Sequence, residues 1–163
     1  GLETVPVSSV KPFNEMTVFE NVLVAVTSNS DLGREEQYER AIASLDHTGM
    51  LWAANRRAAE LGLLDRKRLE LSRALATQPK MLLLDEIGGG LSDGEAMELL
   101  EMICALSRKG ITIVWVEHIV SLLLQAASRL LCLHDGGIIA DGRPEAVIED
   151  PAVMSAYLGG GIP

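Results

Sequence analysis

The chain has 163 residues, of which 48% are hydrophobic and 4% aromatic, and its formal net charge at pH 7 is −9. This length suffices for a domain with a substantial core, which aliphatic side chains must fill. The negative charge argues against nucleic-acid binding, because that binding depends on lysine and arginine side chains that neutralise phosphates. No apolar run reaches the roughly 18 residues of a membrane-spanning helix, and no secretory signal is predicted at the start of the chain.

The two cysteines, Cys104 and Cys132, lie in apolar stretches. They are predicted to be reduced core residues of a cytosolic protein rather than a disulfide pair. The histidines are scattered without the spacing of metal ligands.

The first half of the chain is predicted to be helical after an irregular start. Thr17 and Glu20 have the spacing of a capping box, which predicts the beginning of a helix. The charged, alanine-rich stretch 34–63 is predicted to form further helices. Asp65 is expected to be the N-cap of an amphipathic helix that ends before Pro79.

Strands and helices alternate in the second half. The runs "MLLLD" at 81–85 and "ITIVWVEH" at 111–118 are apolar and short, which predicts strands covered on both faces. Between them, Ser92 and Glu95 form a second capping box. With a third predicted strand, "RLLCLH" at 129–134, this order is typical of a parallel α/β sheet.

The Asp-Gly pair at 135–136 predicts a hairpin turn after the third strand. The chain is predicted to divide into an irregular N-terminal segment, a helical subdomain, a partial core, and C-terminal helices with a tail, at residues 1–13, 14–78, 79–142 and 143–163.

Polar residues end two of the predicted strands, as Asp85-Glu86 and Glu117-His118. Ligands of open parallel sheets bind beyond the carboxyl ends of the strands. Because side chains alternate along a strand, Asp85 and Glu86 are expected to point in different directions. One carboxylate can then serve a metal ion while the other orients a water, a division of labour that suits phosphoryl transfer to water.

These residues lie in motifs that resemble those of the ABC transporter ATPases. The run "KMLLLDE" resembles the Walker B strand, "GLSDGE" the D-loop, and "VWVEH" the switch strand with its histidine. The stretch "LGLLDRKRLELSRALATQPK" resembles the signature loop and its helix, and "VKPFNEMTVFENVLVA" the start of the helical subdomain after the Q-loop. The ending "GGIIADGRPEAVIEDPAVMSAYLGG" looks like that of ATP-binding subunits of branched-chain amino acid importers.

The resemblance implies an α/β fold, namely a partial RecA-like P-loop NTPase core with an α-helical signature subdomain. It also implies roles for single residues. Asp85 would bind Mg²⁺, Glu86 would polarise the attacking water, and His118 would contact the γ-phosphate. Asp93 would lie in the D-loop and touch a partner subunit.

The sequence departs from the family in three places. The lysines are followed by proline, arginine, methionine and glycine, so the chain contains no Lys-Ser or Lys-Thr of a P-loop. The family places that motif before the Q-loop, and the chain is expected to start after it. Ser8 occupies the place of the Q-loop glutamine. The signature segment 61–65, which begins with the nucleotide-binding candidates Leu61 and Gly62, carries Leu64 where the family has a second glycine and ends in an acidic Asp65.

The implied function is that of an ATP-binding and ATP-hydrolysing subunit, truncated or degenerate, of an importer for branched-chain amino acids. ATP and Mg²⁺ are the cofactors by resemblance, and weak or absent binding, with no activity, is expected of this chain alone. One alternative is a non-catalytic interaction module that docks on a membrane subunit or another ATPase. A third reading is a fragment of a longer chain that carries the P-loop.

The resemblance also implies where the protein acts and with what. The partners would be a membrane-spanning transporter subunit and a second ATPase subunit, with no nucleic acid. The location would be cytoplasmic, peripheral to the inner face of the membrane. Because apolar strands without neighbours pair readily with other chains, the isolated chain is expected to be a homo-oligomer.

Overall fold

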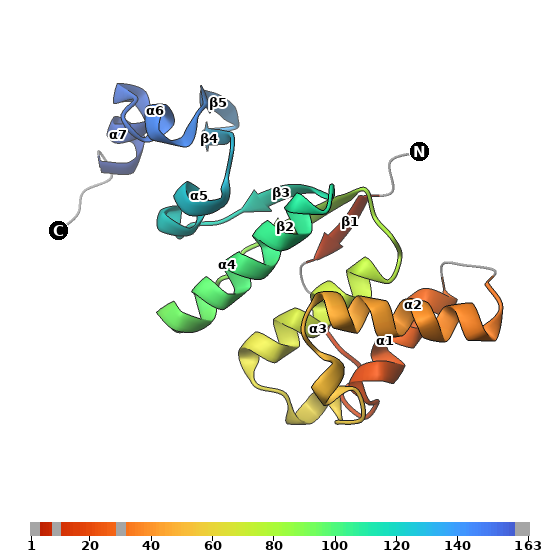
Figure 1. Cartoon of the computed structure of the whole chain (residues 1–163). Helices are drawn as coiled ribbons and strands as arrows, with labels where there is room; N and C mark the ends of the chain where they lie inside the picture. The colour runs from red at the N-terminus through yellow and green to blue at the C-terminus, as the bar shows by residue number, and fades with distance from the viewer. Residues whose placement is uncertain (1–3, 8–10, 29–31, 159–163) are drawn as a thin grey trace. The chain divides into compact units, whose positions relative to one another are not determined.

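The structure is a computed structural model that describes residues 4–7, 11–28 and 32–158. It contains two compact units, Gly1–His118 and Ile119–Pro163 (Figure 1). The boundary after His118 divides the predicted core segment 79–142 between the two units. The other predicted boundaries stay predictions.

The first unit contains a three-stranded parallel sheet in the order β1-β2-β3, which confirms the predicted parallel sheet. The strands are β1 (Thr4–Val7), β2 (Met81–Asp85) and β3 (Thr112–Val116). The prediction that residues 1–13 are irregular is wrong for β1, which pairs with β2 over its whole length. Pro6 is compatible with this pairing because β1 is an edge strand of the sheet, where a missing N–H is tolerated.

The sheet has one covered and one open face. On the covered face, Leu82 and Leu84 are buried in a core built with α3 (Leu63–Leu75) and α4 (Asp93–Arg108), which Figure 1 shows beside the strands. On the other face, Val114 and Val116 of β3 are 45% and 59% exposed. The prediction that both strands are covered on both faces is therefore wrong for β3, because the helices of this core pack on one side only.

A helical group forms a second core in the same unit. It is built from α1, α2, two short 3₁₀ helices and α3, with bounds Val18–Thr27, Arg34–His47, Leu51–Ala53, Ala58–Glu60 and Leu63–Leu75. Helix α3 contributes to both cores, with Leu69 in the helical core and Leu71 in the sheet core. The first turn of α1 is held by the predicted capping box of Thr17 and Glu20, and that of α4 by Ser92 and Glu95.

Helix α3 begins earlier than the sequence predicts. Its N-cap is Gly62, with extended backbone angles, and not Asp65. The reason is a tertiary contact. Leu64 is buried in the sheet core, so the first turn of the helix packs against that core. Asp65 lies instead within that first turn, where a negative charge interacts favourably with the helix dipole.

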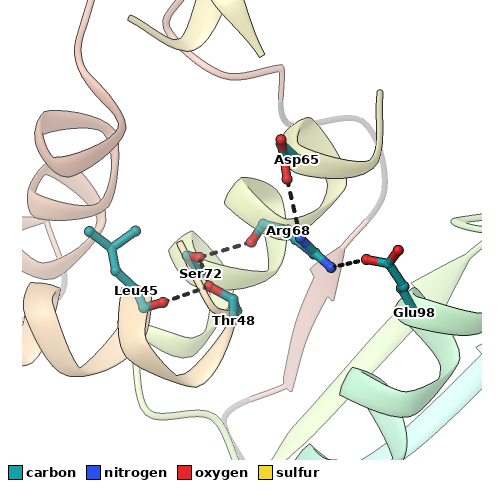
Figure 2. Close-up of polar contacts among 6 residues, drawn as sticks. All are labelled: Leu45, Thr48, Asp65, Arg68, Ser72 and Glu98. Atoms are coloured by element: carbon teal, nitrogen blue, oxygen red, sulfur yellow. Dashed lines mark hydrogen bonds and ion pairs between the residues drawn. The ribbon is translucent and has the colours of Figure 1, made fainter. Parts of the chain in front are cut away.

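Polar contacts join α3 to its neighbours (Figure 2). The hydroxyl groups of Thr48, after α2, and Ser72, in α3, are buried and lie 2.5 Å apart. One turn before Ser72 in α3, Arg68 donates from Nη2 to Glu98 Oε2 of α4 at 2.7 Å and from Nη1 to Asp65 Oδ1 at 3.3 Å. Helix α3 is thus tied to α2 by hydroxyl groups and to α4 by an ion pair.

The described part of the second unit contains an antiparallel hairpin and three helices. These elements are α5 (Val120–Ala126), β4 (Leu130–His134), β5 (Gly137–Gly142), α6 (Pro144–Ile148) and α7 (Pro151–Leu158). The predicted turn at 135–136 is confirmed, with positive φ at both residues. The third predicted strand was expected in the parallel sheet; among the residues that the structure describes, it pairs instead with β5 in this hairpin. Among the described residues, no helix is long and apolar enough to cross a membrane.

Glu70 gives α3 a pH-dependent stability. Burial raises the pKa of its carboxyl, and the neighbouring Lys67 and Arg73 offset this only in part. Because the folded pKa lies above the unfolded one, the folded state holds the proton more tightly, and this contribution to stability is lost as pH rises through the folded pKa. We predict that Glu70→Gln flattens the pH dependence of the free energy of unfolding above about pH 4, the ordinary range of a glutamate.

Urea unfolding monitored by circular dichroism at several pH values measures this dependence. Glu101→Gln, which changes an exposed glutamate of α4, is the matched control and should keep the parent slope. An unchanged slope in Glu70→Gln would contradict the assignment.

Candidate functional site

The carboxyl ends of β2 and β3 bring three of the predicted residues together. Asp85 is the last residue of β2 and is exposed, and Glu86 follows it directly. His118 follows β3, and its Nδ1 lies 4.0 Å from Glu86 Oε1. Both side chains are 65% exposed, so this edge of the sheet presents two acids and an imidazole to solvent.

The backbone at Glu86 departs from strand geometry. Glu86 has a φ of 47°, in the left-handed region that few residues other than glycine adopt. Its N–H donates to Val116 O of β3 at 2.9 Å, which continues the parallel pairing one residue beyond β2. Glu86 therefore lies outside the regular alternation of β2, and the predicted difference in direction between Asp85 and Glu86 stays a prediction.

Glu117 belongs to this site, although it was predicted only as a polar strand end. Its side chain is fully buried. Oε1 accepts the N–H of Gly88 at 2.6 Å and Oε2 accepts the N–H of His118 at 3.3 Å. The sequence contains a signal for this burial. Alternation along β3 puts Ile113 and Trp115 on the covered face, and Glu117 is the next residue in that series.

The turn after Glu86 packs against the segment that resembles the signature loop. Gly90 has a φ of +79°, and a Cβ added there would lie 3.1 Å from Leu63 Cδ2. Because real Cβ atoms rarely approach other atoms so closely, both the conformation and the space at this position favour glycine. The two motifs, distant in the sequence, are therefore in contact within the first unit.

The segment 61–65 is fixed by the two cores. Leu61 is buried in the helical core and Leu64 in the sheet core. Arg66 donates from Nε to Leu61 O at 3.0 Å. The Leu64 side chain therefore does not project into solvent, and of these residues Gly62 and Leu63 are the exposed ones.

Asp93 and Ser8 are the remaining predicted residues. Asp93 is the first residue of α4, exposed and next to the capping residue Ser92. Ser8 lies outside the described residues. Within the part of the chain that the structure describes, no group of three or more acidic, histidine or cysteine side chains is arranged to hold a metal ion.

Comparison with known proteins matches both ends of the chain. A family model described as ABC transporter matches residues 2–88, and one described as branched-chain amino acid ATP-binding cassette transporter matches residues 138–162. The high-affinity branched-chain amino acid transport ATP-binding protein LivG of Escherichia coli is 36% identical over 92% of this chain. BraF of Pseudomonas aeruginosa, described in the same words, is 32% identical over 93% of it.

The matched relatives are longer than this chain, which spans 65% of the length of LivG and of BraF. Among solved structures, a crystal structure of the ADP conformation of an ATP-binding cassette of an ABC transporter superposes with a TM-score of 0.85. Its sequence is 31% identical, and the match covers 96% of this chain and 68% of that one. The parallel sheet and helices described above therefore have the arrangement of part of such a cassette.

The contact between Gly90 and Leu63 can be tested by a double-mutant cycle. We predict that Gly90→Ala lowers the free energy of unfolding by about 1–2 kcal/mol, because alanine disfavours the left-handed conformation. Part of the loss is steric, since the added methyl group meets Leu63. In a Leu63→Ala background the same substitution should therefore cost less, with a coupling of roughly 0.5–1 kcal/mol.

Gly110→Ala is the matched control. Gly110 also has a positive φ, +92°, but a Cβ added there meets nothing within 4 Å. It should lose stability through the backbone alone and show no coupling to Leu63→Ala. Equal coupling for both glycines in denaturant unfolding would refute the contact.

Proposed function

This chain belongs to the ABC transporter family, and from that premise we propose that it is part of an ATP-binding subunit that hydrolyses ATP to drive the import of branched-chain amino acids. The observation that carries the proposal is the approach of His118 Nδ1 to Glu86 Oε1, 4.0 Å apart at the carboxyl ends of two parallel strands. A carboxylate that orients water beside an imidazole is an arrangement suited to hydrolysis of a phosphoanhydride.

Each acid fits one role in this proposal. Asp85 presents hard oxygen ligands at the strand end, and Mg²⁺ in nucleotide sites takes one or two protein carboxylates together with phosphates. The ion would neutralise charge on the phosphates. Glu86 would accept a hydrogen bond from the attacking water, and His118 would contact the γ-phosphate, the role that the resemblance implies.

The chain does not supply every part of such a site. None of its lysines is followed by serine or threonine, so the phosphate-binding loop of the family has no counterpart in this sequence. The proposal is therefore that this chain contributes the carboxylates and histidine, and that a P-loop segment contributes most of the phosphate contacts.

The transported solute and the partners are proposed from similarity. The C-terminal family match and the names of LivG and BraF favour branched-chain amino acids. A lipopolysaccharide export protein, LptB of Acidithiobacillus ferridurans, is 32% identical as well. Since ATP-binding subunits of this family dimerise and work with membrane subunits, we propose a second ATPase subunit and a membrane-spanning subunit as partners, at the cytoplasmic face of the membrane.

A second candidate function, a non-catalytic docking module, is favoured by the segment 61–65. At the position of the family's second glycine, Leu64 is committed to the sheet core. Asp65 adds a negative charge, which its ion pair with Arg68 offsets only in part. An acid at the start of this helix opposes the binding of a phosphate there.

A fusion that places a family P-loop segment ahead of residue 1 separates the two candidates. Calorimetry of the chain alone should show no Mg-ATP binding tighter than about 1 mM, on the order of −4 kcal/mol. The fusion should bind ATP in the micromolar range and hydrolyse it. Glu86→Gln in the fusion should keep the affinity and lower turnover at least about 100-fold, because the amide cannot accept a proton from water.

Glu101→Gln in the fusion is the matched control and should keep full turnover. Turnover that persists in Glu86→Gln would refute the role of Glu86. A fusion that binds ATP without hydrolysing it, even after Asp65→Gln, would favour the docking module.

The open face of the sheet supports the proposed homo-oligomer. Val114 and Val116 are exposed there beside the half-buried Leu83. Covering such surface releases roughly 25 cal/mol per Å² of apolar area. We predict that light scattering across a dilution series finds a dimer, and that Val114→Lys shifts it to a monomer.

Ile42→Lys, which places the same charge at an equally exposed apolar position of α2, is the control and should leave the dimer intact. A parent chain that is monomeric at micromolar concentration would contradict the proposal.

A further inference from the structure

We propose that Glu117 is a positioning residue of this site, whose buried carboxylate holds the turn after Glu86 and the backbone of His118 in one arrangement. The inference rests on the proposed roles of Glu86 and His118. It concerns a residue whose side chain accepts hydrogen bonds from the backbone of His118 and of Gly88, two residues after Glu86, and does not itself face solvent.

The burial of Glu117 sets it apart from its neighbours. The side chain is 0% exposed, whereas those of Glu86 and His118 are 65% exposed. An ionised carboxylate is removed from water at a large cost in free energy unless it accepts hydrogen bonds from fixed donors. The burial of Glu117 at the edge of an exposed site therefore depends on the groups that donate hydrogen bonds to its carboxylate.

Both donors are backbone N–H groups of the site. Gly88 donates to Oε1 at 2.6 Å, a short distance typical of a charge-assisted hydrogen bond. His118 donates to Oε2 at 3.3 Å. One carboxylate thus joins the segment that follows β2 to the segment that follows β3, across 29 residues of sequence.

The link restrains Glu86 from its C-terminal side. Its left-handed backbone is disfavoured relative to the right-handed region and persists only if neighbouring contacts hold it. On the N-terminal side, the N–H of Glu86 is bonded to Val116 O. On the C-terminal side, Gly88 is bonded to Glu117. Both hydrogen bonds are accepted by residues at the end of β3, Val116 and Glu117. The end of this strand therefore restrains the backbone on either side of the Glu86 carboxylate.

The same carboxylate lies beside the imidazole. Glu117 Oε2 is 3.7 Å from His118 Nδ1, the nitrogen that also lies nearest to Glu86 Oε1. A carboxylate next to one ring nitrogen favours the tautomer with the proton on that nitrogen. Glu117 therefore acts on His118 in two ways, by fixing its backbone and by favouring the Nδ1–H form.

Nuclear magnetic resonance of the chain tests the proposal without any hydrolysis. In the unmodified chain, the Gly88 amide proton should resonate downfield and exchange at least tenfold more slowly than that of Gly90. Glu117→Gln replaces one acceptor oxygen of the carboxylate with an NH₂ group, which donates. The Gly88 amide proton should therefore exchange about tenfold faster, while exchange of the Leu82 amide proton is unchanged. The ¹⁵N shifts of His118 should move toward the Nε2–H tautomer.

Glu101→Gln is the matched control and should change none of these signals. Gly88 exchange as fast as that of Gly90 in the unmodified chain overturns the proposal, and this measurement stands even if Glu117→Gln does not fold. Unchanged Gly88 exchange and unchanged His118 shifts in a folded Glu117→Gln overturn it as well. If Glu86→Gln leaves hydrolysis intact in the fusion, the proposed function fails while the result for Gly88 still decides the position of the turn.

Discussion

The packing of helix α3 into two cores is the constraint on which the first unit depends. Leu69 belongs to the core of the helical group, whereas Leu64 and Leu71 belong to the core beneath the sheet. Arg68, from the same helix, holds α4 through Glu98. A helix fixed on two sides has little freedom to turn about its axis, and so the segment that precedes it, which resembles the signature loop, is held in a defined place beside the turn at Gly90.

Parallel pairing then determines which polar groups meet at the sheet edge. The pairing of β2 with β3 extends to Asp85 opposite Val116, so the residues that follow these strands emerge side by side. Regular strand geometry does not by itself bring Glu86 toward His118. A left-handed residue and a buried carboxylate complete the arrangement, and both are local irregularities that the surrounding structure stabilises.

The sequence predicted the features that depend on short-range contacts. The capping boxes of α1 and α4 and the hairpin turn at 135–136 are encoded within four residues each, and the structure contains all of them. Features that depend on distant partners were missed. Thr4–Val7 forms a strand because it pairs with β2. Asp65 is not the N-cap of α3, because Leu64 packs into a core formed by residues far along the chain and the helix begins before Asp65. Strand alternation could have placed Glu117 on the same face as Ile113 and Trp115. Its burial could not be predicted, because the sequence does not show which face of the sheet the helices cover.

Leu64 stands where the family has a glycine, and its burial changes how this substitution could affect a bound phosphate. A leucine that projected into the nucleotide site would block a phosphate by its bulk, but this side chain is in the core, where removing it would leave a cavity. Truncating buried leucines costs about 2–5 kcal/mol, so the glycine cannot return here without a loss of stability of that order. Under the proposed function, an obstacle to phosphate binding at the start of α3 would then be electrostatic rather than steric. It resides in the Asp65 carboxylate, whose partner Arg68 is shared with Glu98 and therefore neutralises it only in part.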